Sequence, residues 1–230
     1  MDTTADIYDE LARAGYYKSE EPVSLEQFER TLGELGTWFD PVVIRVGIRH
    51  PNLGKTVGLF AHNECNHYAH CLAWYCVEDD GADDRLFISP MAPLERALDE
   101  AQLEHLEHAH VTLMRARVPK TTIVRRERGR PILFGPLGLC AFDEDVPGRR
   151  EAVEAFYRAR LELAERHRLS GLSLRTGQFL IIDDRRYMHG RHALPDGCGR
   201  VIRRQYLDLH DGEAWLARTV ERRPFGTMEA

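Results

Sequence analysis

Three segments of the chain carry apolar residues at the spacing of an amphipathic helix. Ser24 precedes the first as an N-cap, and Gly36 ends it. The second covers residues 93–107, where leucines recur on one side, and the third covers residues 149–167. We therefore predict three helices, each with one face packed against a core.

Strands are predicted between these helices, because β-branched and aromatic residues cluster there between turn residues. The runs are 41–48, 58–60, 71–77, 85–89, 121–126, 179–182 and 200–209. Strands predominate in this pattern, so we expect a mainly β fold with helices packed on its outside.

The length of 230 residues suits a single hydrophobic core. The sequence has no internal repeat and no Pro/Gly/Ser-rich linker long enough to separate two domains. We therefore expect one domain over residues 1–230. A formal net charge of −6 favours neither a nucleic acid nor an anionic membrane as the partner.

The sequence also carries signals for the compartment. Its longest apolar run, residues 71–77, is far below the ~18 residues that a membrane span needs, and the acidic N-terminus lacks the pattern of a signal peptide. The five cysteines are an odd number without a C-x-x-C pair, which indicates reduced thiols. We therefore expect a cytoplasmic protein.

Two short segments at the ends of predicted strands contain residue types that bind metal. His62 and Glu64 are two positions apart, so in extended backbone both point to the same face. A second segment, residues 183–191, supplies His189. Two imidazoles and one carboxylate on one face leave coordination positions open, which is the arrangement of non-haem Fe(II) oxygenases. The sequence therefore predicts His62, Glu64 and His189 as metal ligands.

Arginines follow the second segment at strand spacing. Arg200 and Arg204 are four apart, so in a strand both point to the same side together with Ile202. Inward-facing guanidiniums among apolar neighbours need anions as partners, and carboxylates fit them in a bidentate manner. We therefore expect an acidic small molecule as a ligand. Arg203 has the opposite parity and is expected on the solvated side of an edge strand.

Together these segments resemble the Fe(II)/2-oxoglutarate-dependent oxygenases of the taurine dioxygenase and clavaminate synthase-like family. Residues 62–64 are similar to its His-x-Asp/Glu motif. Residues 183–191 are similar to its D-N-R-R-x-x-H-G-R segment, with Asp184 in place of Asn, and residues 196–204 to its D-G-x-x-R-x-x-x-R ending.

The resemblance implies a double-stranded β-helix (jelly roll, cupin-like) with flanking helices and the metal at the mouth of the barrel. It implies that His62, Glu64 and His189 ligate Fe(II). It also implies that Arg200 binds the distal carboxylate of 2-oxoglutarate and that Arg204 lies near a carboxylate of the cosubstrate or substrate. The implied activity is hydroxylation, or desaturation, of an amino acid or related small molecule with Fe(II), 2-oxoglutarate and O₂, in a biosynthetic pathway.

Two further positions bear on the ligands. Where the family has a threonine that donates to the cosubstrate carboxylate, this chain has Asp84. Arginine-hydroxylating relatives hold the substrate guanidinium with an acidic pair in a region comparable to Asp143 and Asp145, so we expect these two to face a cationic side chain. A solvated acidic loop before the third helix is the alternative for this pair.

Other interpretations of these sequence features remain open. A cupin-like metalloenzyme that needs no 2-oxoglutarate, or a non-catalytic regulatory protein that binds metal or an acidic ligand, would use the same triad. Cysteines and histidines near the first motif could form a zinc cluster, although their spacing fits no closed tetrahedral pattern. Six arginines between residues 115 and 130 indicate a solvated face, with a docking patch for an acidic carrier protein as the alternative.

Overall fold

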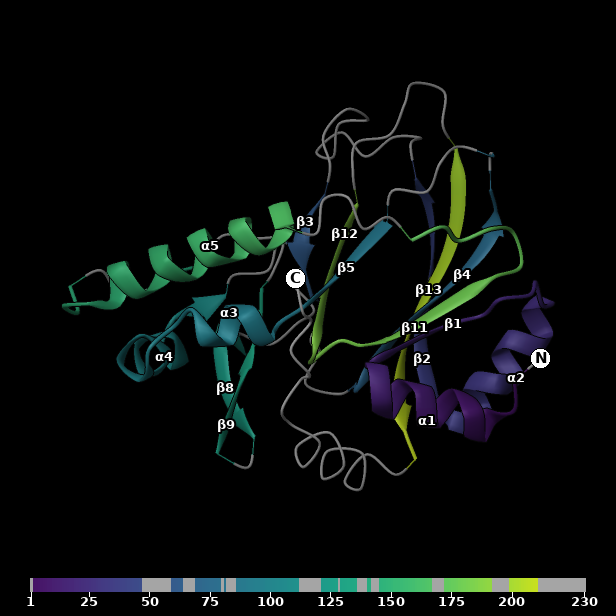
Figure 1. Ribbon diagram of the computed structural model, residues 1–230, viewed down its shortest axis with the longest axis horizontal. Helices are drawn as coiled ribbons and strands as arrows, with labels where there is room; N and C mark the ends of the chain where they lie inside the picture. The colour runs from purple at the N-terminus through teal and green to yellow at the C-terminus, as the bar shows by residue number, and fades with distance from the viewer. Residues whose placement is uncertain are drawn as a thin grey trace.

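The computed structural model describes most of the chain. The described residues are 2–46, 59–63, 69–79, 81, 86–111, 121–127, 129–135, 140–141, 145–166, 172–191 and 199–210. In this part of the chain the fold is mainly β with flanking helices, and the strand pairs are antiparallel (Figure 1).

Two sheets form the centre of the molecule. The larger has the strand order β1-β11-β4-β13-β2 and the smaller has the order β3-β12-β5. The strands of the larger sheet are β1 (Tyr16–Lys18), β11 (Phe179–Asp183), β4 (Cys71–Glu78), β13 (Arg200–Leu209) and β2 (Gly36–Val46). Those of the smaller sheet are β3 (Leu59–His62), β12 (Tyr187–Arg191) and β5 (Leu86–Pro90).

Short strands and helices complete the described structure. The short strands are β6 (His110–Val111), β7 (Thr121–Thr122), β8 (Val124–Glu127), β9 (Arg130–Leu133) and β10 (Cys140–Ala141). The helices are α1 (Thr4–Ala14), α2 (Leu25–Leu35), α3 (Ala92–Arg96), α4 (Glu100–Glu107) and α5 (Arg149–Arg166).

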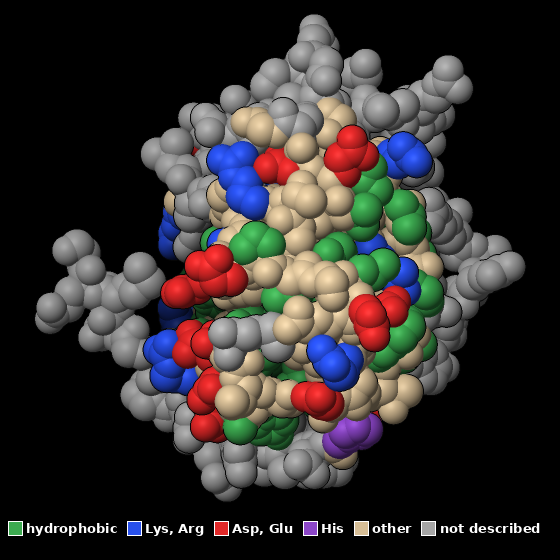
Figure 2. Space-filling view, turned by 90° about the vertical axis from the view of Figure 1, so that its right-hand side faces the viewer, with side chains coloured by type: hydrophobic (Ala, Val, Ile, Leu, Met, Phe, Trp, Pro, Cys, Tyr) green, Lys and Arg blue, Asp and Glu red, His purple; other side chains and the backbone are tan. Residues whose placement is uncertain are grey.

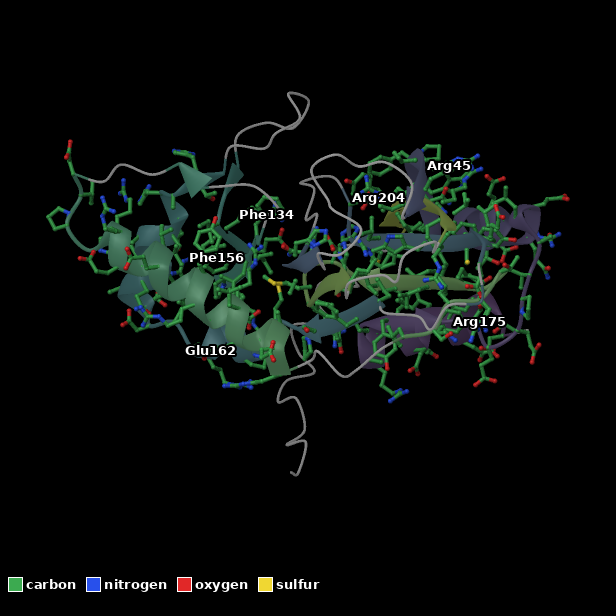
Figure 3. The ribbon with its side chains drawn as sticks, turned by 90° about the horizontal axis from the view of Figure 1, so that it is seen from above. Arg45, Phe134, Phe156, Glu162, Arg175 and Arg204 are labelled. Carbon is green, nitrogen blue, oxygen red and sulfur yellow. The ribbon has the colours of Figure 1, made fainter. Side chains whose placement is uncertain are left out.

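Strand alternation divides the core into layers. On one face of the larger sheet, Ala73, Tyr75 and Phe179 pack against α1 and α2. On its other face, Leu72, Trp74 and other side chains pack towards the smaller sheet. A third cluster joins α3, α4 and α5 to the outer side of the smaller sheet, and the labelled Phe134 and Phe156 belong to it (Figure 3). The space between the two sheets is therefore lined by both of them.

The predicted helices are confirmed with one correction. Residues 25–35 form α2 between the N-cap Ser24 and the C-cap Gly36, and residues 149–166 form α5. The expected helix over residues 93–107 is wrong as a single element, because it divides into α3 and α4. Asp99 caps α4 in a capping box with Gln102, and such a cap requires extended backbone at that residue. The N-terminal helix α1 was not among the predicted elements.

The strand predictions are confirmed in place, while their bounds move. β2 begins at Gly36, five residues before the expected start. The run 121–126 divides into β7 and β8 around Ile123. The pairing of β12 between β3 and β5 was not predicted, although β12 contains the second metal-binding motif.

The turn from β11 to β12 holds helix α1 in place. The Arg186 guanidinium donates to the carbonyls of Leu11 and Ala12 at 3.4 and 3.2 Å, and the Tyr187 hydroxyl donates to Ala14 O at 2.6 Å. These carbonyls belong to the last turn of α1, where carbonyl groups commonly lack intrahelical donors, although Leu11 O also accepts from the Gly15 amide. The turn therefore connects the N-terminal helix to the strand that carries His189.

The surface in Figure 2 mixes both signs of charge. Basic and acidic side chains lie beside one another on this face, with apolar side chains between them. Such mixing is typical of a solvated surface. Among the described helices, none is both long and apolar enough to cross a membrane.

Gly15 and Gly33 provide a matched test of the α1 junction. Gly15 has φ +83°, and a Cβ there would lie 2.4 Å from Tyr187 Cε2, whereas a Cβ at Gly33 meets nothing within 4 Å. We expect Gly15→Ala to lower the free energy of unfolding by about 2 kcal/mol or more. Gly33→Ala should raise it by roughly 0.5 kcal/mol. Denaturant unfolding measures the change for each variant. Equal effects would contradict the close packing of Gly15 against Tyr187.

Candidate metal centre

His62 and His189 face each other between the two sheets. They are direct partners in the antiparallel pairing of β3 with β12, and their ring centroids are 4.1 Å apart. Both residues are buried. The Trp74 ring on β4 meets His189 edge-on at 4.7 Å. The structure therefore brings together two of the three predicted ligands, which are far apart in the sequence.

Strand alternation explains why both imidazoles point inward. Met188 and Ala61 precede the two histidines by one position, and both pack into the cluster beneath α5. Residues with the opposite parity, His189 and His62, must then point towards the larger sheet. On each short strand, one face thus carries an apolar side chain packed beneath α5 and the opposite face carries an imidazole.

The environment of His189 favours the neutral imidazole. Burial lowers the pKa of His189 well below its usual value, and the nearby His62 and Arg204 lower it further. Its Nδ1 is buried and accepts or donates no hydrogen bond among the described residues, and the Asp184 carboxylate lies 3.8 Å away, too far for one. A neutral imidazole with an unsatisfied nitrogen is the form that binds a metal ion.

Asn63, between His62 and Glu64, is a positioning residue that the sequence analysis missed. Its side-chain amide donates to Leu133 O and Asp184 O, both at 2.9 Å, and its Oδ1 accepts from the Gly135 amide at 2.7 Å. Asn63 is almost fully buried. One side chain therefore ties the end of β3 to the segment after β9 and to the turn before β12.

Arg204 reaches the histidines from the larger sheet. It pairs with Trp74 across β13 and β4, and its guanidinium lies over the Tyr206 ring at 5.5 Å. Trp74 in turn contacts His189, so Arg204 lies on the histidine side of the sheet, and its charge lowers the pKa of His189. Figure 3 shows Arg204 on the sheet part of the molecule. An anion bound near the histidines would meet this positive charge.

Arg200 lies on the same face of β13, farther along the strand. It is four positions from Arg204, which is roughly 13 Å of extended chain. Its Nη2 donates to Leu174 O at 3.1 Å and contacts Asp79 Oδ1 at 3.4 Å. The expectation that inward arginines need an external anion is thus corrected for Arg200, because Asp79 of the protein itself supplies a carboxylate.

Arg203 corrects a second expectation. β13 lies between β4 and β2, so it is not an edge strand. Arg203 does face away from the histidines, as its parity predicted, but it forms an ion pair with Glu29 of α2 and lies near the Trp38 ring. Its side chain is only 20% exposed, so it belongs to the packing of α2 on the sheet.

Several predicted site residues lie outside the described residues. These are Glu64, Asp143 and Asp84. Asp145 is described and exposed, in the turn that precedes α5. Among the described residues, no group of three or more His, Cys, Asp and Glu side chains converges as a metal site. The His62–His189 pair is therefore the described part of the candidate centre.

His70 and Cys71, the described residues of the alternative zinc cluster, have other surroundings than a shared metal site. The His70 imidazole contacts the Asp208 carboxylate and accepts from the Leu209 amide at 3.3 Å. Cys71 is buried on the side of α1 and α2, and burial raises the pKa of its thiol well above the usual value. A protonated thiol is a poor zinc ligand, and Cys65 and His67 lie outside the described residues.

The site residues that sequence reasoning missed had little sequence signal. Asn63 is a single amide, and its partners are backbone atoms that are distant in sequence. Trp74 is one aromatic residue in an apolar strand. Asp79 follows the same strand, and only the fold brings it to Arg200. The position of Asn63 inside the metal motif was the one available hint.

Asn63→Ala tests the connection at the first motif. The substitution leaves the Gly135 amide and the carbonyls of Leu133 and Asp184 without their partner, so we expect a loss of about 3 kcal/mol in the free energy of unfolding. Ser89→Ala is the control, since its buried hydroxyl has no hydrogen bond among the described residues, and its effect should stay within ~1 kcal/mol. Urea unfolding measures the loss for each variant. An effect of Asn63→Ala as small as that of Ser89→Ala would contradict the role of Asn63 in connecting β3 to the two other segments.

The stability of the metal-free protein should depend on pH through His189. The folded pKa is lowered, so below the unfolded value of ~6.5 the unfolded chain binds a proton that the folded chain does not. The free energy of unfolding should therefore fall as pH falls from 7.5 to 5.5, by at most ~1.4 kcal/mol per unit for this group. Unfolding in the presence of a chelator measures it. His189→Gln should remove up to one proton from the difference in bound protons between the unfolded and folded states, so the slope of the free energy of unfolding against pH should decrease. An unchanged slope would contradict the lowered pKa of His189.

Comparison with known proteins was made on sequence and on structure. The sequence matches no model of a protein family and no curated protein. The structure is similar to that of PvcB, "an Fe, alpha-ketoglutarate dependent oxygenase from an isonitrile synthetic pathway", with a TM-score of 0.63 and 19% identity over 90% of this chain and 80% of that one. A second PvcB structure, from Pseudomonas aeruginosa, gives a TM-score of 0.64 and 18% identity over 89% and 80% of the two chains.

Two amino-acid oxygenases have the same architecture. Asparagine oxygenase (AsnO) matches with a TM-score of 0.62 and 17% identity over 90% of this chain and 77% of that one. The non-heme iron oxygenase OrfP, in complex with Fe, succinate and (3S)-hydroxy-L-Arg, matches with a TM-score of 0.61 and 16% identity over 88% and 79%. The resemblance found in the sequence motifs therefore extends to the fold, and this chain has the fold of the Fe/α-ketoglutarate-dependent oxygenases.

Proposed function

We propose that the protein is a non-haem Fe(II)/2-oxoglutarate-dependent dioxygenase that hydroxylates or desaturates an amino acid or a related small molecule. The observation that carries the proposal is the buried pair of His62 and His189 in the space between two sheets, with Arg204 on the adjacent strand β13. The shared fold with Fe/α-ketoglutarate-dependent oxygenases supports it.

His62, His189 and Glu64 are the proposed ligands of Fe(II). The imidazoles fit this role because both are buried and point into one space, and because burial lowers the pKa of His189 and so favours its neutral form. The unsatisfied Nδ1 of His189 fits a site that takes a further partner. Glu64 follows His62 by two positions, so continued extended backbone would bring its carboxylate to the same side. Bound iron would supply O₂ activation, with 2-oxoglutarate converted to succinate and CO₂ and one oxygen atom transferred to the substrate in hydroxylation.

The two inward arginines are the proposed carboxylate-binding residues. Arg204 pairs in register with Trp74, which contacts His189, so it suits a carboxylate of the cosubstrate or substrate close to the metal. Arg200 lies farther along β13, so it suits the distal carboxylate of 2-oxoglutarate. In these roles the guanidiniums orient the cosubstrate before any substrate binds. The apolar lining around Trp74 and Ile202 excludes water from the same space.

An amino acid is the proposed substrate class. AsnO and OrfP have structures in complex with 3-hydroxyasparagine and with (3S)-hydroxy-L-Arg. For this chain, the acidic pair Asp143 and Asp145 remains a prediction for the residues that face a cationic side chain. A biosynthetic role and a complete jelly roll in a single domain over residues 1–230 belong to the same proposal, which leaves open whether the substrate is free or tethered to a carrier protein.

Two arginines of the possible carrier patch, Arg125 and Arg126, have partners within the protein. Arg126 forms ion pairs with Glu100 and Glu107 of α4. Arg125 forms one with Glu127, which also pairs with Arg185. These pairs favour a solvated, structural face for β8 and β9.

The proposal predicts a specific spectroscopic and catalytic result. Anaerobic addition of 2-oxoglutarate to the Fe(II)-loaded protein should produce the visible metal-to-ligand charge-transfer band of a chelated keto acid. Arg200→Ala should weaken 2-oxoglutarate binding about 10- to 100-fold, because it removes a charge-assisted hydrogen bond. Glu64→Ala should abolish turnover, measured as succinate formation with a panel of amino acids.

Arg203→Ala is the matched control, because this arginine lies on the same strand and faces α2. It should leave the band and the affinity for 2-oxoglutarate unchanged. Iron binding without any band would reject the 2-oxoglutarate assignment in favour of a cupin-type metalloenzyme. A band without succinate from any substrate would favour the non-catalytic ligand-binding protein.

A further inference from the structure

A small ionic network lies where β4 ends, remote from α5. The Asp79 carboxylate accepts from Arg175 Nη1 at 3.1 Å through Oδ2, and from the Gly81 amide at 3.2 Å and Arg200 Nη2 at 3.4 Å through Oδ1. The Asp79 amide donates to Thr176 Oγ1 at 2.9 Å. The Asp79 side chain is only 8% exposed. This carboxylate therefore joins three separate segments of the chain.

Arg200 is held at one nitrogen by two of these segments. Its Nη2 donates to Leu174 O at 3.1 Å as well as contacting Asp79. Two acceptors on one guanidinium nitrogen restrict the rotation of a side chain that otherwise has many rotamers. The position of the guanidinium is therefore set before any ligand arrives.

The network also controls the charge of Asp79. Burial raises the pKa of this carboxyl, but the hydrogen bonds from Arg175 and Gly81 and the contact with Arg200 hold it below its usual value. The carboxylate is thus ionised, and its shorter contact to a guanidinium is with Arg175 rather than with Arg200. Arg175, which is labelled in Figure 3, therefore shares the negative charge that would otherwise act on Arg200 alone.

We propose that Asp79 is a positioning residue that orients Arg200 for the distal carboxylate of 2-oxoglutarate, with Arg175 holding Asp79 in place. The inference rests on the proposed function, since it assigns the way in which this chain prepares its cosubstrate site. It concerns the α-keto acids that carry a second carboxylate. A keto acid without one has no use for Arg200 and should not sense Asp79.

The experiment compares two keto acids on the metal-loaded protein. Under anaerobic conditions, calorimetry measures the affinity of the Fe(II)-loaded protein for 2-oxoglutarate and for 2-oxobutyrate, which lacks the distal carboxylate. Asp79→Asn keeps the shape of the side chain and removes its charge. We expect this variant to bind 2-oxoglutarate about tenfold more weakly, with unchanged affinity for 2-oxobutyrate and for Fe(II) alone.

Arg175→Ala and Arg203→Ala complete the comparison. Arg175→Ala should weaken 2-oxoglutarate binding in the same direction by a smaller factor, and Arg203→Ala should have no effect. Thermal unfolding of each variant shows that it is folded, and Arg175→Ala keeps the proposal testable if Asp79→Asn does not fold.

Three outcomes would overturn the proposal. Tighter binding of 2-oxoglutarate by Asp79→Asn would mean that Asp79 competes with the cosubstrate for Arg200. An equal loss for both keto acids would mean a general structural role. Unchanged binding would mean that Arg200 needs no positioning. In each case the wild-type protein binds 2-oxoglutarate, so the proposed function stands, whereas a wild type that binds none overturns both.

Discussion

The pairing of β12 with β3 is the constraint on which the candidate centre depends. It places His189 directly opposite His62, and each histidine points inward because its neighbour in the strand is anchored beneath α5. Asn63 secures this pairing with hydrogen bonds to three backbone groups of two other segments. Buried amides satisfied in this way hold a fixed geometry, because any shift leaves a polar group unpaired in a dry interior.

The larger sheet contributes the charged half of the site. β13 directs Arg200 and Arg204 to the same inner face, and β4 places Trp74 against His189. The protein itself supplies Asp79 as a partner for Arg200, so a buried guanidinium is stable there without a ligand. Arg203, the residue before Arg204, points to the opposite face of the sheet and forms an ion pair with Glu29 of α2. One strand thus divides its arginines between a ligand site and a structural contact by parity alone.

The sequence predicted those parts of the fold that depend on local pattern. The helix between Ser24 and Gly36 was predicted from its apolar periodicity and its caps, and the strand over residues 71–77 from its run of apolar residues. Both signals act over a few residues. The segment 93–107 was predicted as one helix because its leucines keep the helical period across a break that the Asp99 cap creates. Strand β12 was missed because Gly190 and Arg191 weaken its strand pattern, whereas pairing with a strand on each side stabilises it.

For the candidate site, the sequence by itself determined the donor types, the His-x-Glu spacing and the parity of the arginines, because strand alternation follows from backbone geometry. Only the tertiary structure decided that His189 lies opposite His62, that Asn63 joins the two motifs and that Asp79 and Arg175 reach Arg200. These contacts connect residues up to 127 positions apart, counted from His62 to His189. No local pattern encodes them, because each depends on which strands become neighbours when the two sheets bury their apolar faces against each other.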